Sequence, residues 1–275
     1  MARVITIGNR KGGSGKTTTA VCVAAGLAHR GRSVLIVDLD PQAHATLSLG
    51  VRTVPSGGMY AVLAEGRPLS EILLPTYREN LRLLPGSRRL SEYERVYTPV
   101  REARHRLAEA LRPAASSFDF VIMDTPPTLG LLTISALIAS TELYIPMQAH
   151  YLALDGLADM IRTVATINKL YGTELRIRGV IPTFFQERAR LSKAVLADIR
   201  SHLGDNAILS PVRTSIALAE APSHGMSIFQ YDAKSAGAMD YLAVVARIDQ
   251  DRDGEAQPGP QAAVATGRQG IAGGP

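Results

Sequence analysis

The stretch GNRKGGSGKTT, residues 8–18, directly follows a short apolar run at residues 4–7 and opens a long helix-forming segment. This strand–loop–helix context is the one in which a glycine-rich loop binds phosphate. Its glycines let backbone amides converge on phosphate oxygens, Lys16 supplies positive charge to the β- and γ-phosphates, and the Thr17 hydroxyl can ligate Mg²⁺. The stretch therefore predicts a nucleotide-binding loop made of Gly12, Gly13, Ser14, Gly15, Lys16, Thr17 and Thr18.

Acidic residues follow two other apolar runs. Residues 34–37 lead into Asp38 and Asp40, and residues 120–123 lead into Asp124. In an open α/β sheet these positions face the crevice in which ligands bind. A carboxylate at the end of an apolar strand can also reach Mg²⁺, often through water, so we predict Asp124 to be part of the metal shell.

Short β-rich runs alternate with helix-length segments along the chain. Near-continuous apolar strands joined by crossovers predict a doubly wound α/β fold, with a mostly parallel sheet covered by helices on both faces. The expected strands are residues 4–7, 33–37, 81–84, 118–123, 142–146 and 175–181, and the expected helices are residues 16–30, 91–111, 152–171 and 191–203.

The domain organisation follows from composition. We expect residues 1–248 to form a single domain, with residues 52–75, which carry Pro, Gly and Ser, as an excursion from its core. Residues 249–275 are rich in Gly, Ala, Gln and Pro without apolar periodicity, and are expected to be a disordered tail.

The composition also limits the possible functions. No uninterrupted apolar stretch of membrane-spanning length and no signal peptide is visible, which predicts a cytoplasmic protein without a membrane partner. The single Cys22 cannot form an internal disulfide or hold an iron–sulfur cluster. A net charge of +5 modestly favours polyanionic partners.

The phosphate loop departs from the ordinary consensus, because Arg10 stands where glycine is usual and a second lysine, Lys11, precedes the glycine pair. The pattern KGGxGKT resembles the deviant Walker A motif of the ParA and MinD ATPases. DLDPQ at residues 38–42 and DTPP at residues 124–127 match further motifs of the ParA pattern. The similarity covers nearly all of residues 2–248, and its later blocks look like the ParA branch.

This resemblance implies an ATPase that uses Mg²⁺, closes as an ATP-sandwich homodimer and partitions plasmids, chromosomes or other cellular cargo. In the family the early lysine, here Lys11, reaches the partner's phosphates, so the implied catalytic residues are Lys11, Lys16 and Asp40, with Asp40 positioning the attacking water. Asp38 would support the metal and its water shell. The resemblance also implies slow hydrolysis stimulated by a ParB-like protein or cargo adaptor.

Two further segments receive roles from the resemblance. Residues 125–128 would form a switch that senses the γ-phosphate, and Thr183 together with the segment from Pro211 to Ser215 would lie near the adenine. ParA-branch members bind DNA non-specifically as ATP dimers, which would place this protein on the nucleoid. One departure is Ala217, where chromosomal relatives often carry arginine; it favours a plasmid-type or cargo-positioning member.

A basic helix face is visible without the family. At 100° per residue, Arg190, Lys193 and Arg200 fall within about 80° of arc, opposite an apolar stripe. With Arg188 just before them, they are candidate DNA-binding residues, although an ordinary solvated helix face has the same pattern. Contacts to phosphates alone would give salt-sensitive binding independent of base sequence.

Two alternatives from other classes stay open. A MinD-like ATPase acting at a membrane surface should end in a basic amphipathic helix, and residues 262–275 show no such pattern. A DNA-binding adaptor that does not hydrolyse ATP would have no need of the three acids Asp38, Asp40 and Asp124. Measured ATP turnover separates this adaptor from an ATPase.

Overall fold

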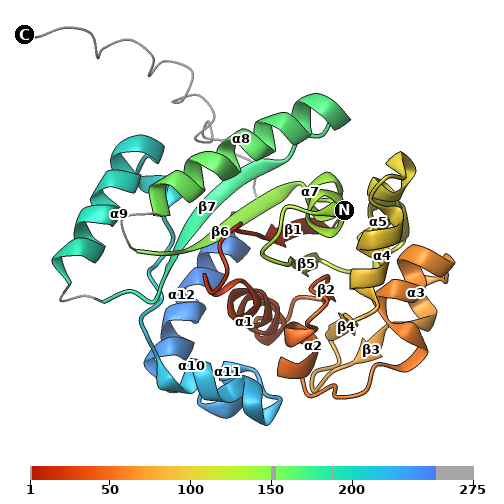
Figure 1. Cartoon of the computed structure of the whole chain (residues 1–275). Helices are drawn as coiled ribbons and strands as arrows, with labels where there is room; N and C mark the ends of the chain where they lie inside the picture. The colour runs from red at the N-terminus through yellow and green to blue at the C-terminus, as the bar shows by residue number, and fades with distance from the viewer. Residues whose placement is uncertain (1, 150–152, 187–188, 252–275) are drawn as a thin grey trace, which may run out of the picture.

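The computed structural model describes residues 2–149, 153–186 and 189–251 (Figure 1). One seven-stranded sheet has the strand order β3-β4-β2-β5-β1-β6-β7, and all its pairings are parallel except β3 with β4. The fold class expected from the sequence is therefore confirmed. The strands are β1 (Arg3–Ile7), β2 (Val34–Asp38), β3 (Leu74–Pro75), β4 (Leu81–Leu84), β5 (Phe120–Asp124), β6 (Glu142–Gln148) and β7 (Arg176–Thr183).

Helices cover both faces of the sheet (Figure 1). The first face packs against α1 (Lys16–His29), α2 (His44–Ser48), α11 (Ile228–Tyr231) and α12 (Ala236–Gln250), with α10 (Ile216–Glu220) beside them. The second face packs against α3 (Met59–Glu65), α4 (Leu90–Tyr97), α5 (Arg106–Leu111), α6 (Ala114–Ser117) and α7 (Leu131–Ala139). Helices α8 (Ala153–Tyr171) and α9 (Arg190–Leu203) cover β6 and β7.

The central strands are apolar throughout because both of their faces are buried. On β2, Val34 and Ile36 join the cluster around α1, whereas Leu35 and Val37 join the cluster around α5 and α7. The alternation follows from the two-residue period of a strand. It explains why these runs show no alternation of apolar and polar residues in the sequence.

Two local expectations were wrong. The helix expected over residues 91–111 is interrupted: α4 ends at Tyr97, a short 3₁₀ helix covers Arg101–Arg104, and α5 begins at Arg106. Pro99 lies at the break, because proline lacks the amide hydrogen that would continue the helical hydrogen bonds. Residues 52–75 are not an excursion, because they include α3 and β3 and bury Met59 and Leu63 in the core.

The predicted end of the domain at residue 248 falls inside α12, which continues to Gln250. Asp249, which is only 4% exposed, accepts hydrogen bonds from Arg30 and Arg32 at the end of α1. These contacts join the last helical turn to the core. Residues 252–275 of the predicted tail lie outside the described residues. None of the described helices combines the length and the apolar character that crossing a bilayer requires.

Candidate nucleotide-binding site

The glycine-rich loop joins β1 to α1 at the carboxyl end of the sheet. Gly13 and Gly15 have positive φ angles of 72° and 84°, a region that residues with a Cβ atom rarely adopt. Gly15 is also the N-cap of α1, so the loop runs directly into the amino end of a helix. Amide groups at a helix amino end favour an anion, which supports the prediction of a phosphate site.

The two lysines of the loop have different surroundings. Lys16 is only 7% exposed, and its Nζ donates a 3.0 Å hydrogen bond to the backbone carbonyl of Lys11. Burial lowers the pKa of Lys16, while the carboxylates of Asp124 and Asp40 oppose that shift. Lys11 is exposed, as are Gly12 and Gly13. One lysine therefore faces the interior of the loop and the other its rim.

Three side chains outside the predicted set hold this loop or the helix that follows it. Asn9 is buried; its amide donates a 2.7 Å hydrogen bond to the Pro146 carbonyl, and its side-chain oxygen accepts one from the Lys11 amide. Gln148, at the end of β6, donates to the Gly13 carbonyl. Thr19, one turn into α1, shares a hydrogen bond with the hydroxyl of Tyr241 on α12.

Asp38 is fully buried at the end of β2 and is held by its neighbours. Its carboxylate accepts hydrogen bonds from the amide and the hydroxyl of Thr46, at 2.8 and 2.6 Å, and from the Asp40 amide at 3.1 Å. Burial raises the pKa of Asp38 to about 6, although the hydrogen bonds from Thr46 and Asp40 oppose the shift. With its oxygens occupied, Asp38 suits an indirect role beside a metal, through a water shell.

Asp124 differs from Asp38, because neither of its carboxylate oxygens has a hydrogen-bond partner among the described residues. It is fully buried, and burial raises its pKa well above the usual range, with the neighbouring charge of Asp38 adding to the shift. Lys16 and Thr17 act in the opposite direction. A buried carboxylate that lacks a hydrogen-bond partner among the described residues, and that lies close to a threonine hydroxyl and a lysine, fits a site for a divalent cation.

Two other groups lie at the same edge of the sheet. Asp40 is 8% exposed, and its Oδ1 accepts a 2.9 Å hydrogen bond from the Gln42 amide; Oδ2, which accepts no hydrogen bond from the described residues, could accept one from a water. The Ser14 hydroxyl is buried without a hydrogen-bond partner among the described residues, which fits a group that hydrogen-bonds a bound ligand. The described residues contain no cluster of three or more His, Cys, Asp or Glu side chains that could hold a metal, so phosphate and water would complete the shell.

The segment expected to sense the γ-phosphate is fixed at its start. Thr125 follows Asp124 directly, and its hydroxyl donates a 3.0 Å hydrogen bond to the Ile7 carbonyl at the end of β1. Residues 127–129 are exposed. This arrangement places the predicted switch between the metal-shell candidate and α7.

The structure brings the two predicted adenine segments together. The Val212 amide donates a 2.7 Å hydrogen bond to the Pro182 carbonyl, next to both Pro211 and Thr183. The Thr183 hydroxyl in turn donates to the Ser14 carbonyl of the phosphate loop at 2.9 Å. A base bound here would lie against the same loop that holds the phosphates.

The predicted DNA-binding residues are placed only in part. Lys193 and Arg200 are exposed on α9, opposite the buried Val195 and Ile199. Helix α9 begins at Arg190, but the Arg190 side chain and all of Arg188 lie outside the described residues. In Figure 1, α9 lies beside α8 on the side of the molecule remote from α3 and α5.

Sequence reasoning missed Thr46 and Gly86. Thr46 makes the two shortest of the hydrogen bonds described above for Asp38, and a Cβ at Gly86 would come within 2.9 Å of the Asp38 Cγ. Gly86 closely follows β4, and a glycine after a strand at the carboxyl edge of a parallel sheet is a signal that the sequence offered. Thr46 belongs to no motif, so nothing marked it in advance.

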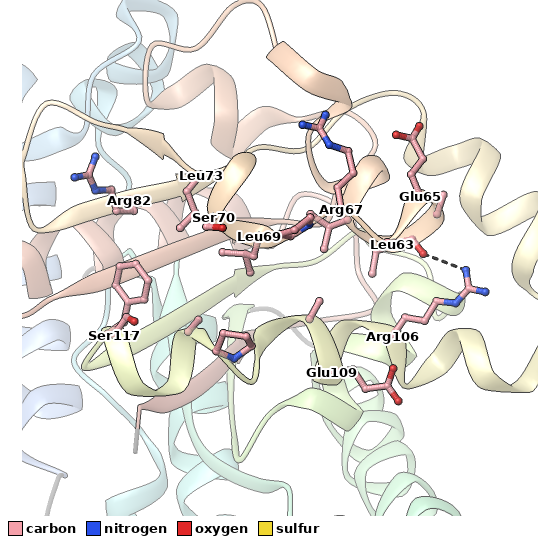
Figure 2. A pocket seen from close by; sticks show the side chains of 18 residues that line it. Leu63, Glu65, Arg67, Leu69, Ser70, Leu73, Arg82, Arg106, Glu109 and Ser117 are labelled. Atoms are coloured by element: carbon pink, nitrogen blue, oxygen red, sulfur yellow. Dashed lines mark hydrogen bonds between the residues drawn. The ribbon is translucent and has the colours of Figure 1, made fainter.

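A large cavity in the described part of the chain lies elsewhere (Figure 2). It has a volume of about 940 Å³, and α3, β4, α5 and α6 contribute to its wall. Leu63, Leu69 and Arg67 come from one side of it and Arg106 and Glu109 from the other, and no residue of the predicted nucleotide site lines it. Size alone therefore does not identify the functional site; the glycine loop and its carboxylates do.

Comparisons with known proteins agree with the fold. The family described as an AAA domain matches residues 2–177. The sporulation initiation inhibitor protein Soj of Bacillus subtilis is 38% identical over 249 residues, 90% of this chain and 98% of Soj. The chromosome partitioning protein ParA of Myxococcus xanthus is 39% identical over 247 residues, 89% of this chain and 87% of ParA. Among solved structures, cobyrinic acid a,c-diamide synthase of Mycobacterium smegmatis with bound ADP and magnesium has a TM-score of 0.78 at 31% identity, covering 91% of this chain and 95% of that one.

Proposed function

Because this chain belongs to the ParA/MinD family of partition ATPases, we propose that it works as an ATP-dependent homodimeric switch that binds DNA non-specifically and releases it after hydrolysis. The protein is an ATPase that uses Mg²⁺ and that partitions or positions cargo. Membership of this family also implies self-association and contact with a cargo partner. The roles of individual residues, the DNA step and the identity of the partner are our proposals.

One observation carries the dimer proposal: Lys16 is buried in the loop, whereas Lys11 is exposed at its rim. Lys16 is placed to hold the β- and γ-phosphates of the nucleotide in its own subunit. Lys11, exposed at the rim, would reach a nucleotide bound by a second subunit. Positive charge from both sides stabilises the charge that develops during phosphoryl transfer.

The three carboxylates would have different roles in binding the metal and orienting the attacking water. Asp124 and Thr17 would hold Mg²⁺, and Asp38 would act on its water shell. Asp40 would orient the attacking water, because its Oδ1 is fixed by the Gln42 amide and its Oδ2 is available. Bound Mg²⁺ neutralises phosphate charge, and the low dielectric around these buried acids strengthens its attraction to them.

The surface proposed for DNA is the exposed side of α9, with Lys193 and Arg200 and the adjoining Arg188 and Arg190. In a dimer this surface occurs twice, and two basic surfaces bind a polyanion more tightly than one. ATP-dependent dimerisation would thereby switch DNA affinity. A ParB-like protein or cargo adaptor would stimulate hydrolysis and so release the dimer.

The proposal is tested by co-sedimentation with DNA in ATP, in ADP and without nucleotide, over a range of salt concentrations. We expect binding only with ATP, falling steeply with salt, and lost in Lys16→Ala and in the double variant Lys193→Ala/Arg200→Ala. Arg88→Ala/Arg112→Ala removes the same charge from exposed positions near α4 and α5, and should bind DNA like the parent protein.

Binding that does not depend on nucleotide, or an equal loss in the control variant, would overturn the DNA step. Binding of ATP-loaded protein to anionic vesicles but not to DNA would favour the MinD-like alternative. ATP turnover measured on the same samples identifies inactive preparations.

A further inference from the structure

The loop that follows Asp124 is held at its far end by a residue from another helix. Glu94 lies in α4, and its Oε1 accepts a 3.2 Å hydrogen bond from the Leu132 amide in the first turn of α7. The first amides of a helix have no partner inside the helix, and a side-chain oxygen that accepts from the second or third of them acts as a cap. Glu94 thus provides from outside what the N-cap residue, Gly130, cannot provide.

Gly130 makes room for this contact. A Cβ atom at position 130 would collide with the Glu94 carboxylate, although the φ angle of −95° is one that alanine adopts without strain. No acidic residue occurs in the first turn of α7 itself, so the Glu94 charge also complements the positive end of the helix dipole.

The contact between Glu94 and Leu132 matters because it fixes the end of the loop that follows Asp124. Residues 125–130 join the metal-shell candidate to α7. Among the described residues, the side-chain hydrogen bonds that hold this loop run from Thr125 to the Ile7 carbonyl and from Thr133 to the Pro126 and Thr128 carbonyls, at 3.5 and 2.7 Å, and Glu94 accepts from Leu132 just beyond it. Of these anchors, Glu94 comes from a helix that is remote in sequence from both the loop and the phosphate-binding elements. Residues 127–129, between these anchors, are exposed and can respond to a phosphate group.

We propose that Glu94 is a positioning residue of the nucleotide switch: by capping α7 it fixes the end of the loop formed by residues 125–130, so that this loop adopts distinct arrangements with ATP and with ADP. The inference rests on the proposed switch function. It adds to that function a residue outside the proposed nucleotide and metal site. It also identifies α4 as the helix that holds the end of the switch loop.

The chain contains no tryptophan, which makes a specific optical test possible. Leu129, 37% exposed in the switch loop, is replaced by tryptophan, and emission is recorded with Mg-ATP and with Mg-ADP. We expect the two nucleotides to give different emission in Leu129→Trp, and the same emission once Glu94→Ala is added. Because Glu94→Gln keeps an oxygen that can accept from Leu132, it should retain most of the difference.

A second variant displaces the carboxylate without altering Glu94. Gly130→Ala should reproduce the Glu94→Ala result, and the double variant should be no worse than either single variant, since both remove one contact. ATP turnover should fall by about fivefold in each of the two single variants, the factor that corresponds to the free energy of a helix cap. The KM for ATP should change by less than about twofold, because neither substitution alters the phosphate loop. Thermal unfolding shows whether each variant is folded. If Glu94→Ala is unstable, Gly130→Ala and Glu94→Gln still test the inference.

Unchanged emission difference and turnover in both Glu94→Ala and Gly130→Ala would overturn the inference while leaving the switch intact. A general fall in nucleotide affinity in these variants, with a raised KM, would show a structural role instead. If Leu129→Trp itself gives identical emission with ATP and ADP while retaining ATPase activity, the proposed switch fails, and this inference fails with it.

Discussion

Asp38 and Asp124 stand directly opposite each other in register, at the carboxyl ends of the neighbouring strands β2 and β5. Both are fully buried, and the charge of Asp38 raises the pKa of Asp124 beyond the effect of burial. Hydrogen bonds from Thr46 hold Asp38, whereas Asp124 has no such partner among the described residues. Two adjacent buried carboxylates are unfavourable unless a proton or a cation accompanies them.

This pair predicts a pH-dependent difference in stability between the parent protein and Asp124→Asn. A pKa raised in the folded state means that the folded protein binds a proton more tightly than the unfolded chain does. Stability from this group therefore falls as pH rises above the unfolded value of about 4. Without nucleotide, Asp124→Asn should be more stable than the parent at pH 8, by about 1 kcal/mol or more, and the advantage should vanish near pH 4.

Urea unfolding across that pH range measures the difference. Asp155→Asn, an exposed carboxylate on α8, is the matched control and should show no such trend. Mg-ATP should raise the melting temperature of the parent more than that of Asp124→Asn, because the variant lacks the carboxylate proposed to hold the metal. A variant that is less stable than the parent at every pH would contradict this account of Asp124.

The two lysines should separate nucleotide binding from dimer formation. Lys16→Ala should lose binding of a fluorescent ATP analogue, since the buried ammonium is the charge proposed to hold the phosphates. Lys11→Ala should retain binding within a few-fold but remain monomeric with ATP in sedimentation velocity, and its turnover should fall at least about 100-fold. Equal loss of nucleotide binding in both variants would place Lys11 in the site of its own subunit.

Thr46 should be the most sensitive hydroxyl at the site. Thr46→Val keeps the shape of the side chain but removes a hydrogen bond to Asp38 and the acceptor of the Gly86 amide, both buried. Leaving these groups without partners should lower the free energy of unfolding by about 2–3 kcal/mol. Thr166→Val, whose hydroxyl bonds within α8 at an exposed position, should change it by less than about 0.5 kcal/mol. Similar effects of the two substitutions would refute the assignment.

The end of the domain can be tested by truncation. A chain that ends at Ile248 lacks Asp249, so Arg30 and Arg32 lose a buried ion-pair partner, and the free energy of unfolding should fall by about 2–4 kcal/mol. A chain that ends at Asp251 should unfold like the full-length protein. Asp249→Asn separates the loss of charge from the loss of helix. Equal stability of the two truncated chains would restore the boundary at residue 248.

The sequence by itself determined the sheet and the position of the phosphate loop. Apolar runs such as residues 34–37 and 120–123 indicate strands buried on both faces. In the loop between β1 and α1, Gly13 and Gly15 can adopt the positive φ angles that the loop requires. It also placed Asp38, Asp40 and Asp124 at one edge, because the carboxyl ends of parallel strands meet there. These features are local in the chain, so a local pattern suffices to predict them.

Tertiary structure alone decided which acid is held by hydrogen bonds and which has no hydrogen-bond partner among the described residues. Thr46, Gly86 and Glu94 act on Asp38 and on α7 across gaps in sequence that no motif spans, and the core role of α3 depends on the space between β2 and α5. Likewise, Asp249 belongs to the domain because the end of α12 meets the end of α1. Such contacts depend on where packing brings distant backbone segments together, and the pattern of residues along the chain does not give the distance between those segments in space.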